Sequence, residues 1–497
     1  MISNAVKEEL RKIAGKDNFF DEIEERICYS YDGTTFKSKP DIVLKPANAQ
    51  EVSHVLKVAN REKIPVVPRG AGTGLSGGSV PIEGGIVLAM NRMKKILSID
   101  EENLVAFVEP GVINEEFQKE VERRGLFYPP DPASQKMCTL GGNIAECAGG
   151  PHCLKYGVTR DYVLGLEAVL ADGSIINTGG QVMKNVSGYD LTRLLIGSEG
   201  TLGVVTKIVL KLLPLPEDRR TILAAFSTME RAAETVSAII ASRLIPATLE
   251  FMDGVTVKVV EEFLKIGLPT TADALLLIEV DGKKEAVEID YEKIMKICKD
   301  KGAVELKGAR TSGERENLWK ARRAVSAALG RICPLKLNED VVVPRSKLPL
   351  LITKVKEICT EFGIKSANYG HAGDGNIHVN ILIESRADDE MKKVEPALEK
   401  LYKEVVNLGG TISGEHGIGF LKSKYLALGA GVESVNVMRK IKDALDPNNI
   451  LNPGKIFAVN PSSLSGEEKI NSPRPSLTKR GDNSLSKGAR KRVRGKE

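Results

Sequence analysis

The stretch PRGAGTGLSGG, residues 68–78, contains the spacing G-x-G-x-x-G, the fingerprint of dinucleotide-binding Rossmann folds. In those folds a helix begins at the loop and holds the pyrophosphate at its N-terminus. Here the chain continues as SVPIEGGIVLAM, residues 79–90, whose proline and paired glycines prevent a helix. The Rossmann interpretation therefore fails. Two alternatives remain: an ordinary turn-rich surface loop, or a loop whose backbone N–H groups converge on a phosphate.

Two further glycine-rich loops follow, PPDPASQKMCTLGGNIAECAGGP at 129–151 and IGSEGTLGVVT at 196–206. The chain from about 38 to 216 otherwise consists of short apolar runs bounded by glycine and proline, a pattern typical of strands and tight loops. Three such loops in one domain favour the phosphate-binding interpretation, because together they suit a long, bent cofactor. The prolines and charges of KLLPLPEDRR, residues 211–220, predict a domain boundary.

After this boundary the pattern changes to alternating strands and helices. The predicted order is strand, helix, strand, twice over: 220–226, 229–243 and 247–252, then 274–280, 283–302 and 303–309. Two successive β-α-β units of this size predict a ferredoxin-like half-domain. Further helices are expected at about 313–330, 346–362 and 387–407, with short strands between them.

The three loops, in this order, resemble those of the FAD-linked oxidases and dehydrogenases of the vanillyl-alcohol oxidase type, in the branch of glycolate oxidase subunits and D-lactate dehydrogenases. The resemblance covers about 38–458. It implies an α+β fold: a two-subdomain FAD-binding domain of that type at 38–216, then a ferredoxin-like substrate or cap domain with an antiparallel sheet and helices at 217–458. A helical segment is expected at 1–37, and the Ser-, Gly-, Lys- and Arg-rich tail at 459–497 is expected to be disordered.

By this resemblance the loops bind FAD. The first would hold the pyrophosphate, the second would lie along the flavin, the third would reach the adenine side, and ILNPGK at 450–455 would return to the isoalloxazine ring. His152 and Cys138 lie nearby but match no position at which relatives attach flavin, so non-covalent FAD is expected. The implied residues are Arg69, Gly70, Ala71, Gly72, Thr73, Gly74, Ser76, Gly77, Gly78, Pro130, Thr139, Gly142, Asn143, Ala148, Gly149, Gly157, Glu199, Gly200, Gly203, Val205 and Asn452.

A second motif, NYGHAGDGNIHVN at 368–380, contains two of the five histidines. Its flanks have the pattern of strands and its centre that of a turn, so a β-hairpin is predicted. A four-residue loop at 373–376 would place His371 and His378 directly opposite each other, with Cβ atoms about 4.5–5.5 Å apart. Ile377, Val379, Ile381 and Ile383 would form the apolar face, leaving His378 on a polar one.

Two facing imidazoles can share a metal ion. TISGEHGIG, residues 411–419, offers Glu415 as a third ligand beside His416 in another glycine-flanked loop. Two histidines and one carboxylate leave coordination positions open for substrate, although hydrogen-bonding histidines in ordinary turns are the alternative. The resemblance implies that His371, His378 and Glu415 hold a divalent metal, zinc or manganese, and that His416 is the general base.

A carboxylate substrate favours an arginine nearby. LWKARRAVSAALG, residues 318–330, is predicted to be a helix with Arg322 and Ser326 one turn apart on one face. The resembling family has an arginine at the position of Arg322, whereas Arg323 is expected to point outward. Solvated surface charge is the alternative for Arg322.

These parts predict oxidation of a small D-2-hydroxy acid to the 2-oxo acid: the metal acidifies the hydroxyl, His416 removes its proton, and hydride passes to flavin N5. Two other functions remain open. One is an ether-forming flavin enzyme of the alkylglycerone-phosphate synthase kind, and the other is a flavin-free metallohydrolase that uses only the two histidines and the glutamate.

Composition limits the partners. The formal charge of +5 comes from residues 461–497, where ten Lys and Arg oppose four Asp and Glu, so no nucleic-acid-binding surface is indicated. Seven scattered cysteines without a C-x-x-C pair argue against iron–sulfur ligation in this chain and against disulfides. Electrons are therefore expected to pass to an iron–sulfur subunit, an electron-transfer flavoprotein, a quinone or oxygen. Without a signal peptide or transmembrane pattern, a cytoplasmic protein is predicted, peripheral to a membrane only through a partner.

Overall fold

The computed structural model describes residues 2–333, 335–383 and 388–458. The predicted disordered tail at 459–497 lies outside the described residues. Within these ranges no helix is both long and apolar enough to cross a membrane. All seven cysteines are free thiols, as their scattered positions predict.

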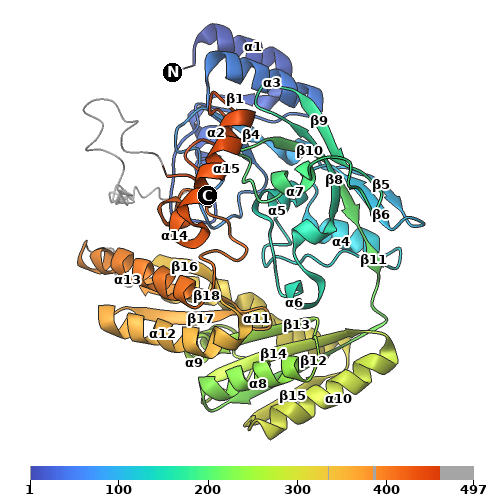
Figure 1. Cartoon of the computed structure of the whole chain (residues 1–497), viewed down its shortest axis with the longest axis vertical. Coiled ribbons are helices and arrows are strands. Elements are labelled where there is room, and N and C mark those ends of the chain that lie inside the picture. The colour runs from blue at the N-terminus through green and yellow to red at the C-terminus, as the bar shows by residue number, and fades with distance from the viewer. Residues whose placement is uncertain (1, 334, 384–387, 459–497) are drawn as a thin grey trace, which may run out of the picture. The chain divides into compact units, whose positions relative to one another are not determined.

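A small mixed sheet lies in the N-terminal part of the chain (Figure 1). In spatial order its strands are β1 (Phe19–Phe20), β2 (Ile42–Leu44), β4 (Ile86–Ala89) and β3 (Val66–Arg69). The last three are parallel, and β1 is antiparallel to β2. Helices α1 (Asn4–Ala14) and α3 (Ala49–Glu62) share the core of this sheet, and the short α2 (Ile23–Cys28) follows β1. The N-terminal segment thus contributes a strand as well as helices.

A second, antiparallel sheet completes the part of the chain that precedes the predicted domain boundary. Its spatial order is β5 (Ile96–Asp100), β6 (Val105–Val108), β10 (Val204–Lys211), β8 (Val163–Val169) and β9 (Ile175–Gly179). A core around Phe117 and Tyr128 joins this sheet to the helices beside it. The remaining elements of this part are α4 (Asn114–Glu122), β7 (Leu126–Phe127), α5 (Leu140–Glu146), α6 (Cys153–Tyr156), α7 (Leu191–Leu195) and β11 (Leu213–Pro214).

The second half of the chain is built on one seven-stranded antiparallel sheet. Its spatial order is β15 (Glu305–Ala309), β12 (Asp218–Phe226), β14 (Ala274–Gly282), β13 (Thr248–Asp253), β17 (Lys365–His371), β18 (Asn376–Ile383) and β16 (Leu335–Val342). The first four strands have the order fourth, first, third, second along the chain, which is the ferredoxin-like arrangement. The predicted fold class is confirmed, and the last three strands extend the same sheet.

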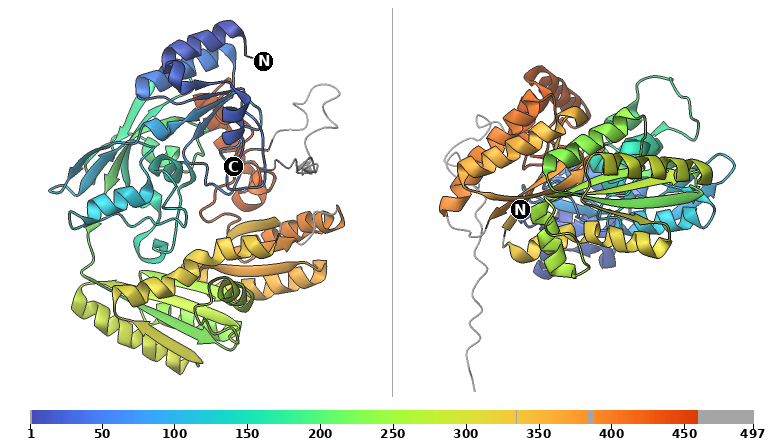
Figure 2. Two further views of the ribbon diagram at one scale, coloured as in Figure 1. Left: turned by 180° about the vertical axis from the view of Figure 1, so that it is seen from behind. Right: turned by 90° about the horizontal axis from the view of Figure 1, so that it is seen from below.

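Helices cover both faces of this sheet (Figure 2). One core contains side chains of α8 (Met229–Ala241), α10 (Lys284–Asp300), α12 (Leu348–Phe362) and α13 (Asp388–Asn407). The other contains side chains of α9 (Gly254–Leu264) and α11 (Ser312–Ile332). Residues of the predicted site lie on this second face.

The end of the described chain returns to the N-terminal sheet. After α14 (Leu426–Ala430) and α15 (Val432–Leu445), the Val66 N–H donates to the Ile450 carbonyl at 2.7 Å, and the Asn452 N–H donates to the Val66 carbonyl at 2.8 Å. Figure 1 shows α15 beside the N-terminal elements. This return brings Asn452 to the glycine-rich loops.

Candidate functional site

The three glycine-rich loops meet in the structure. A Cβ added to Gly70 in the first loop would lie 2.3 Å from Thr139 Oγ1 in the second. In the third loop, the Glu199 N–H donates to the Ala145 carbonyl of the second at 2.8 Å. The fold therefore assembles loops that lie far apart in the sequence.

Asn452 connects two of these loops. Its Nδ2 donates to the carbonyl oxygens of Gly78 and Glu199, at 2.8 and 2.7 Å. The residue is buried, and its backbone is left-handed at φ 44°. Its Oδ1 has no hydrogen-bond partner in the described chain.

Other buried polar atoms at this junction also lack partners within the described residues. They include Ser76 Oγ and Glu146 Oε2. An unpaired buried polar atom costs about 1–3 kcal/mol, so the junction favours a polar ligand. The backbone packs so closely that a Cβ on Gly78 would lie 2.7 Å from Glu146 Oε1. These features fit FAD.

Most of the predicted cofactor residues belong to these loops. Arg69 is buried at the end of β3, where its Nη1 donates to Ser79 Oγ at 3.2 Å. Thr139 caps α5, because its Oγ1 accepts the Gly142 N–H at 3.3 Å. The others in the three loops are Ala71, Gly72, Thr73, Gly74, Gly77, Pro130, Asn143, Ala148, Gly149, Gly200, Gly203 and Val205.

Three predicted cofactor residues lie against the protein scaffold: Gly157 outside the loops, and Gly203 and Val205 at the end of the third loop. Gly157, at φ 83°, faces the Asp161 carboxylate. A Cβ on Gly203 would contact Leu195, and Val205 is part of β10.

Glu199 joins the third glycine loop to the loop of the predicted base. Its carboxylate accepts the N–H groups of Ile418 and Gly419, both at 2.7 Å. Burial raises the pKa of Glu199 to about 7, although these two hydrogen bonds oppose the shift. Burial also raises the pKa of the neighbouring Glu146, which the sequence analysis did not select, and lowers the pKa of Lys455 to about 8. The two carboxyl groups and the lysine amine thus form a buried cluster of ionisable groups.

The predicted hairpin is present in β17 and β18, but its register differs from the predicted register by two residues. The strands are joined by residues 372–375, so that Asn376 faces His371 and Tyr369 faces His378. The prediction that the two histidines are directly opposite is therefore wrong. Asn376 belongs to the strand rather than to the loop, because its Nδ2 donates to Asp340 Oδ1 at 2.6 Å and to the Val341 carbonyl at 3.0 Å.

The two histidines nevertheless lie together. A shift of two residues leaves every side chain on its original face, because side chains alternate with a period of two. His371 and His378 are diagonal neighbours on the polar face, with ring centroids 5.3 Å apart. On the other face, Ile377 and Val379 enter the core as predicted.

Glu415 lies between the two imidazoles. Its Oε1 is 3.3 Å from His371 Nε2 and 3.4 Å from His378 Nε2. All three residues offer ligand atoms within 4.8 Å of one another. Two imidazoles and a carboxylate are a donor set for a divalent transition metal such as zinc or manganese, so these residues fit the predicted metal.

Glu250 of β13, which the sequence analysis missed, orients His371. This fully buried carboxylate has Oε1 2.6 Å from His371 Nδ1, while its Oε2 accepts from Arg322 Nε at 2.6 Å. Burial opposes its ionisation, but the charges of His371 and Arg322 outweigh burial and lower the pKa of Glu250. Because Nδ1 faces Glu250, His371 presents Nε2 to Glu415.

Helix α11 directs its two adjacent arginines in opposite directions. Arg322 is buried, with its guanidinium 4.7 Å from the centre of the Tyr369 ring. Arg323 is exposed and pairs with Glu316, as predicted. Within the described residues, Arg322 donates a hydrogen bond only through Nε. Its terminal nitrogens therefore remain available to a carboxylate.

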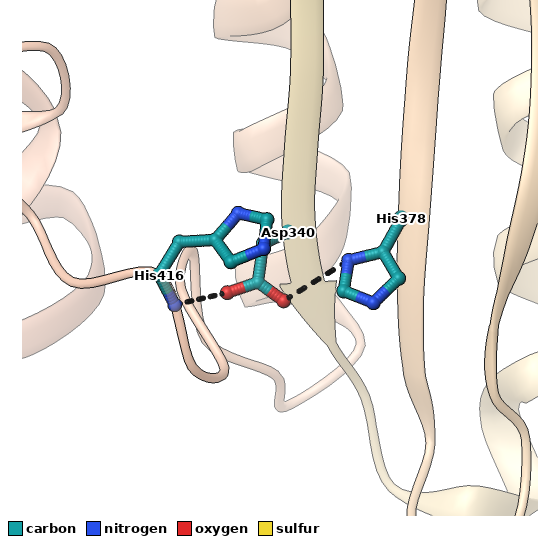
Figure 3. Close-up of side chains that lie close together, drawn as sticks. All are labelled: Asp340, His378 and His416. Carbon is teal, nitrogen blue, oxygen red and sulfur yellow. Dashed lines mark hydrogen bonds and ion pairs between the residues drawn. The ribbon is translucent and has the colours of Figure 1, made fainter. Parts of the chain in front are cut away.

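The imidazole of His416 lies close to that of His378, and Figure 3 shows both residues with Asp340. The rings are nearly parallel at 12°, with centroids 5.2 Å apart. His416 Nδ1 is buried without a hydrogen-bond partner in the described chain. Burial, followed by the charges of His416 and His371, lowers the pKa of His378. This shift keeps His378 neutral, the form that binds metal.

The two predicted sites are in contact. A Cβ on Gly149, in the second glycine loop, would lie 2.7 Å from Glu415 Oε2. The loop expected to lie along the flavin therefore touches a predicted metal ligand.

Comparison with known proteins finds a family match for each half of the chain. Residues 40–179 match the FAD binding domain family, and residues 215–456 match the family of FAD linked oxidases, C-terminal domain. The chain is 50% identical to the glycolate oxidase subunit GlcD of Bacillus subtilis over 459 residues, which cover 92% of this chain and 98% of that protein. It is 41% identical to a D-lactate dehydrogenase of Archaeoglobus fulgidus, covering 84% of this chain and 91% of that protein.

A solved structure agrees with the fold. p-Cresol methylhydroxylase with bound substrate aligns with a TM-score of 0.77 at 18% identity, over 92% of this chain and 97% of that one. At this identity the likeness supports the fold alone. Together with the two domain matches and the GlcD identity, it establishes that this chain is an FAD-binding oxidoreductase and belongs to the FAD-linked oxidases, in the branch of glycolate oxidase subunits and D-lactate dehydrogenases.

Proposed function

We propose that this protein oxidises the CH–OH group of a small D-2-hydroxy acid to the 2-oxo acid, with non-covalent FAD and a divalent metal. The observation that carries this proposal is Glu415, whose Oε1 lies within 3.4 Å of both histidine Nε2 atoms while its other oxygen faces Gly149 of the second glycine loop. A metal-binding cluster that touches the second glycine loop suits a substrate that is chelated by the metal and oxidised by the flavin in one place.

The names of the relatives support this substrate class. Glycolate and D-lactate, named in the GlcD and D-lactate dehydrogenase relatives, are both small 2-hydroxy acids. Their carboxylate and hydroxyl can chelate one cation through a five-membered ring. A bound divalent cation would stabilise the alkoxide form of the hydroxyl.

Five residues of this chain have proposed roles. His371, His378 and Glu415 would hold zinc or manganese, and Arg322 would pair with the substrate carboxylate through its free terminal nitrogens. His416 would accept the hydroxyl proton, a role that suits a buried imidazole with an unpartnered nitrogen. Bound FAD supplies the hydride acceptor at N5.

Electrons must then leave the flavin. The word subunit in the GlcD name supports an assembly with other chains, in which an iron–sulfur subunit accepts the electrons. An electron-transfer flavoprotein and a quinone are the other acceptors in this proposal. We place the protein in the cytoplasm, at a membrane only through such a partner.

The alternative functions have less support. Membership of the FAD-linked oxidases is incompatible with a flavin-free metallohydrolase. Ether formation involves no net oxidation, whereas the relatives named above are an oxidase subunit and a dehydrogenase.

Anaerobic flavin reduction tests the proposal. The purified FAD-loaded protein is mixed with a panel of D- and L-2-hydroxy acids, and the absorbance of oxidised flavin is followed. We expect bleaching by D-lactate or glycolate, no bleaching by L-lactate, and loss of the reaction after chelation with recovery on adding Zn²⁺ or Mn²⁺. Full reduction in metal-stripped protein would exclude the metal, and no reduction by any member of the panel would exclude the substrate class.

A further inference from the structure

A single buried carboxylate is hydrogen-bonded to the loop that carries both Glu415 and His416. Asp340 lies on β16 and is fully buried. Its Oδ2 accepts three consecutive backbone N–H groups, from Gly414, Glu415 and His416, at 2.8, 2.7 and 2.9 Å. Figure 3 shows the carboxylate between the His416 backbone and the His378 ring.

The other oxygen of Asp340 faces His378. Oδ1 is 3.8 Å from His378 Nδ1 and accepts a hydrogen bond from Asn376 Nδ2 at 2.6 Å. His378 Nδ1 is buried and has no hydrogen-bond partner in the described chain. An Nδ1–H directed at Asp340 leaves the Nε2 lone pair for a cation beside Glu415, just as Glu250 does for His371.

Asp340, His378 and His416 also offer atoms close enough to hold a metal ion themselves. The hydrogen bonds argue against that role. A cation on Asp340 Oδ2 would face the positive ends of three N–H dipoles, and Oδ1 is already paired with Asn376. Asp340 is therefore better suited to holding the loop than to ligating a metal.

We propose that Asp340 is a positioning residue that orients a metal ligand and the general base together. Through three hydrogen bonds it fixes the backbone of Glu415 and His416, and through its second oxygen it orients the ring of His378. The loop can approach this closely because Gly414 has no side chain: a Cβ there would lie 2.6 Å from Val342 Cγ2 and 3.1 Å from Asp340 Oδ1. This inference rests on the roles proposed above for Glu415, His378 and His416.

Asp340→Asn tests the inference, because the amide retains the volume and loses the charge. In the FAD-loaded, metal-free protein we expect faster amide hydrogen exchange in peptides covering 413–417, with unchanged exchange elsewhere. We also expect about 10- to 100-fold weaker binding of Mn²⁺ or Zn²⁺ in chelator competition. Asp253→Asn is the matched control, since Asp253 is a buried carboxylate of the same sheet that accepts the N–H groups of Thr256 and Asn368 at 2.8 and 2.7 Å.

The outcomes are separable. Unchanged exchange at 413–417 together with unchanged metal affinity in Asp340→Asn would overturn the inference, and so would equal effects of Asp253→Asn on both readouts. If Asp340→Asn does not fold, Asp340→Glu keeps the charge on a longer arm and should give the same two changes at smaller size; wild-type values in that variant would also overturn the inference. Neither readout uses a substrate, so failure of the proposed oxidation would appear separately, as unreduced flavin in the wild-type protein.

Discussion

The glycine-rich loops and the histidine–carboxylate cluster are built in different ways. The loops act through backbone, and each is one contiguous stretch that a Cβ would disturb, as at Gly70 and Gly78. The cluster acts through side chains from four strands of one sheet, helix α11 and one loop. A site built from backbone can therefore be recognised in the sequence as a motif, whereas a site built from side chains can be recognised in the sequence only in part.

The largest effect is expected from the cluster. His371→Ala removes one of the proposed metal ligands, so turnover with D-lactate or glycolate should fall to background while the FAD content stays normal. Steady-state rates and the absorbance spectrum of the purified variant provide the measurement. Retained turnover would contradict the metal role of His371, and loss of FAD would show that His371 also supports FAD binding.

A smaller effect is expected from a change in the glycine loops, and it should affect FAD binding rather than metal binding. Gly72 has φ 71°, so Gly72→Val strains the backbone and adds a branched side chain beside Arg69. We expect FAD affinity to fall about 10-fold or more, with metal binding intact. Gly125→Val is the control, because Gly125 has φ 72° outside the loops and has no atom near its Cβ position. Equal FAD loss in both variants would indicate general unfolding.

A third change tests whether the cluster depends on distant strands. Glu250→Gln removes the charge behind His371, so metal affinity should fall about 10- to 100-fold, as measured by chelator competition. Glu279→Gln on β14 is the control: its carboxylate accepts hydrogen bonds from Thr221 and Trp319, at 2.7 and 2.9 Å. If only the control variant bound metal more weakly, the role assigned to Glu250 would be rejected.

The smallest effect concerns the contact between the two regions. The folded-state pKa of Glu199 is about 7 against an ordinary value of 4.5, so the folded protein binds this proton more tightly than the unfolded chain. The resulting stabilisation is present below about pH 4.5 and is lost as the pH rises through about 7. Glu199→Gln should therefore flatten the decline in unfolding free energy across this window, measured by denaturant titration at several pH values. An unchanged slope would argue that Glu199 is ionised throughout.

Chance also contributed to the success of the hairpin prediction. The sequence places His371 and His378 on strands around a glycine turn, and their shared face follows from the period of two. The register was wrong because the side chain of Asn376 bonds Asp340, a residue of another strand. A one-residue error would have separated the histidines.

Glu250 and Asp340 had only a weak signal in the sequence. Each is a charged residue within an apolar strand, TLEFMD for the first and LNEDVV for the second. Such a residue suggests a buried partner but does not identify it. The partners are His371, Arg322 and the amides of residues 414–416, all distant in sequence.

The amino-acid sequence by itself determined the order of the glycine loops and the ferredoxin-like repeat, because each depends on local spacing or backbone freedom. The proposed metal-binding triad also needed the resemblance to the FAD-linked oxidases. Only the tertiary structure decided the hairpin register, the inward direction of Arg322, and the pairing of each histidine with its own carboxylate. These depend on hydrogen bonds between strands that are neighbours in the sheet and not in the chain. A buried carboxylate is stable only with such partners, so the order of strands in the sheet decides which histidine each carboxylate orients.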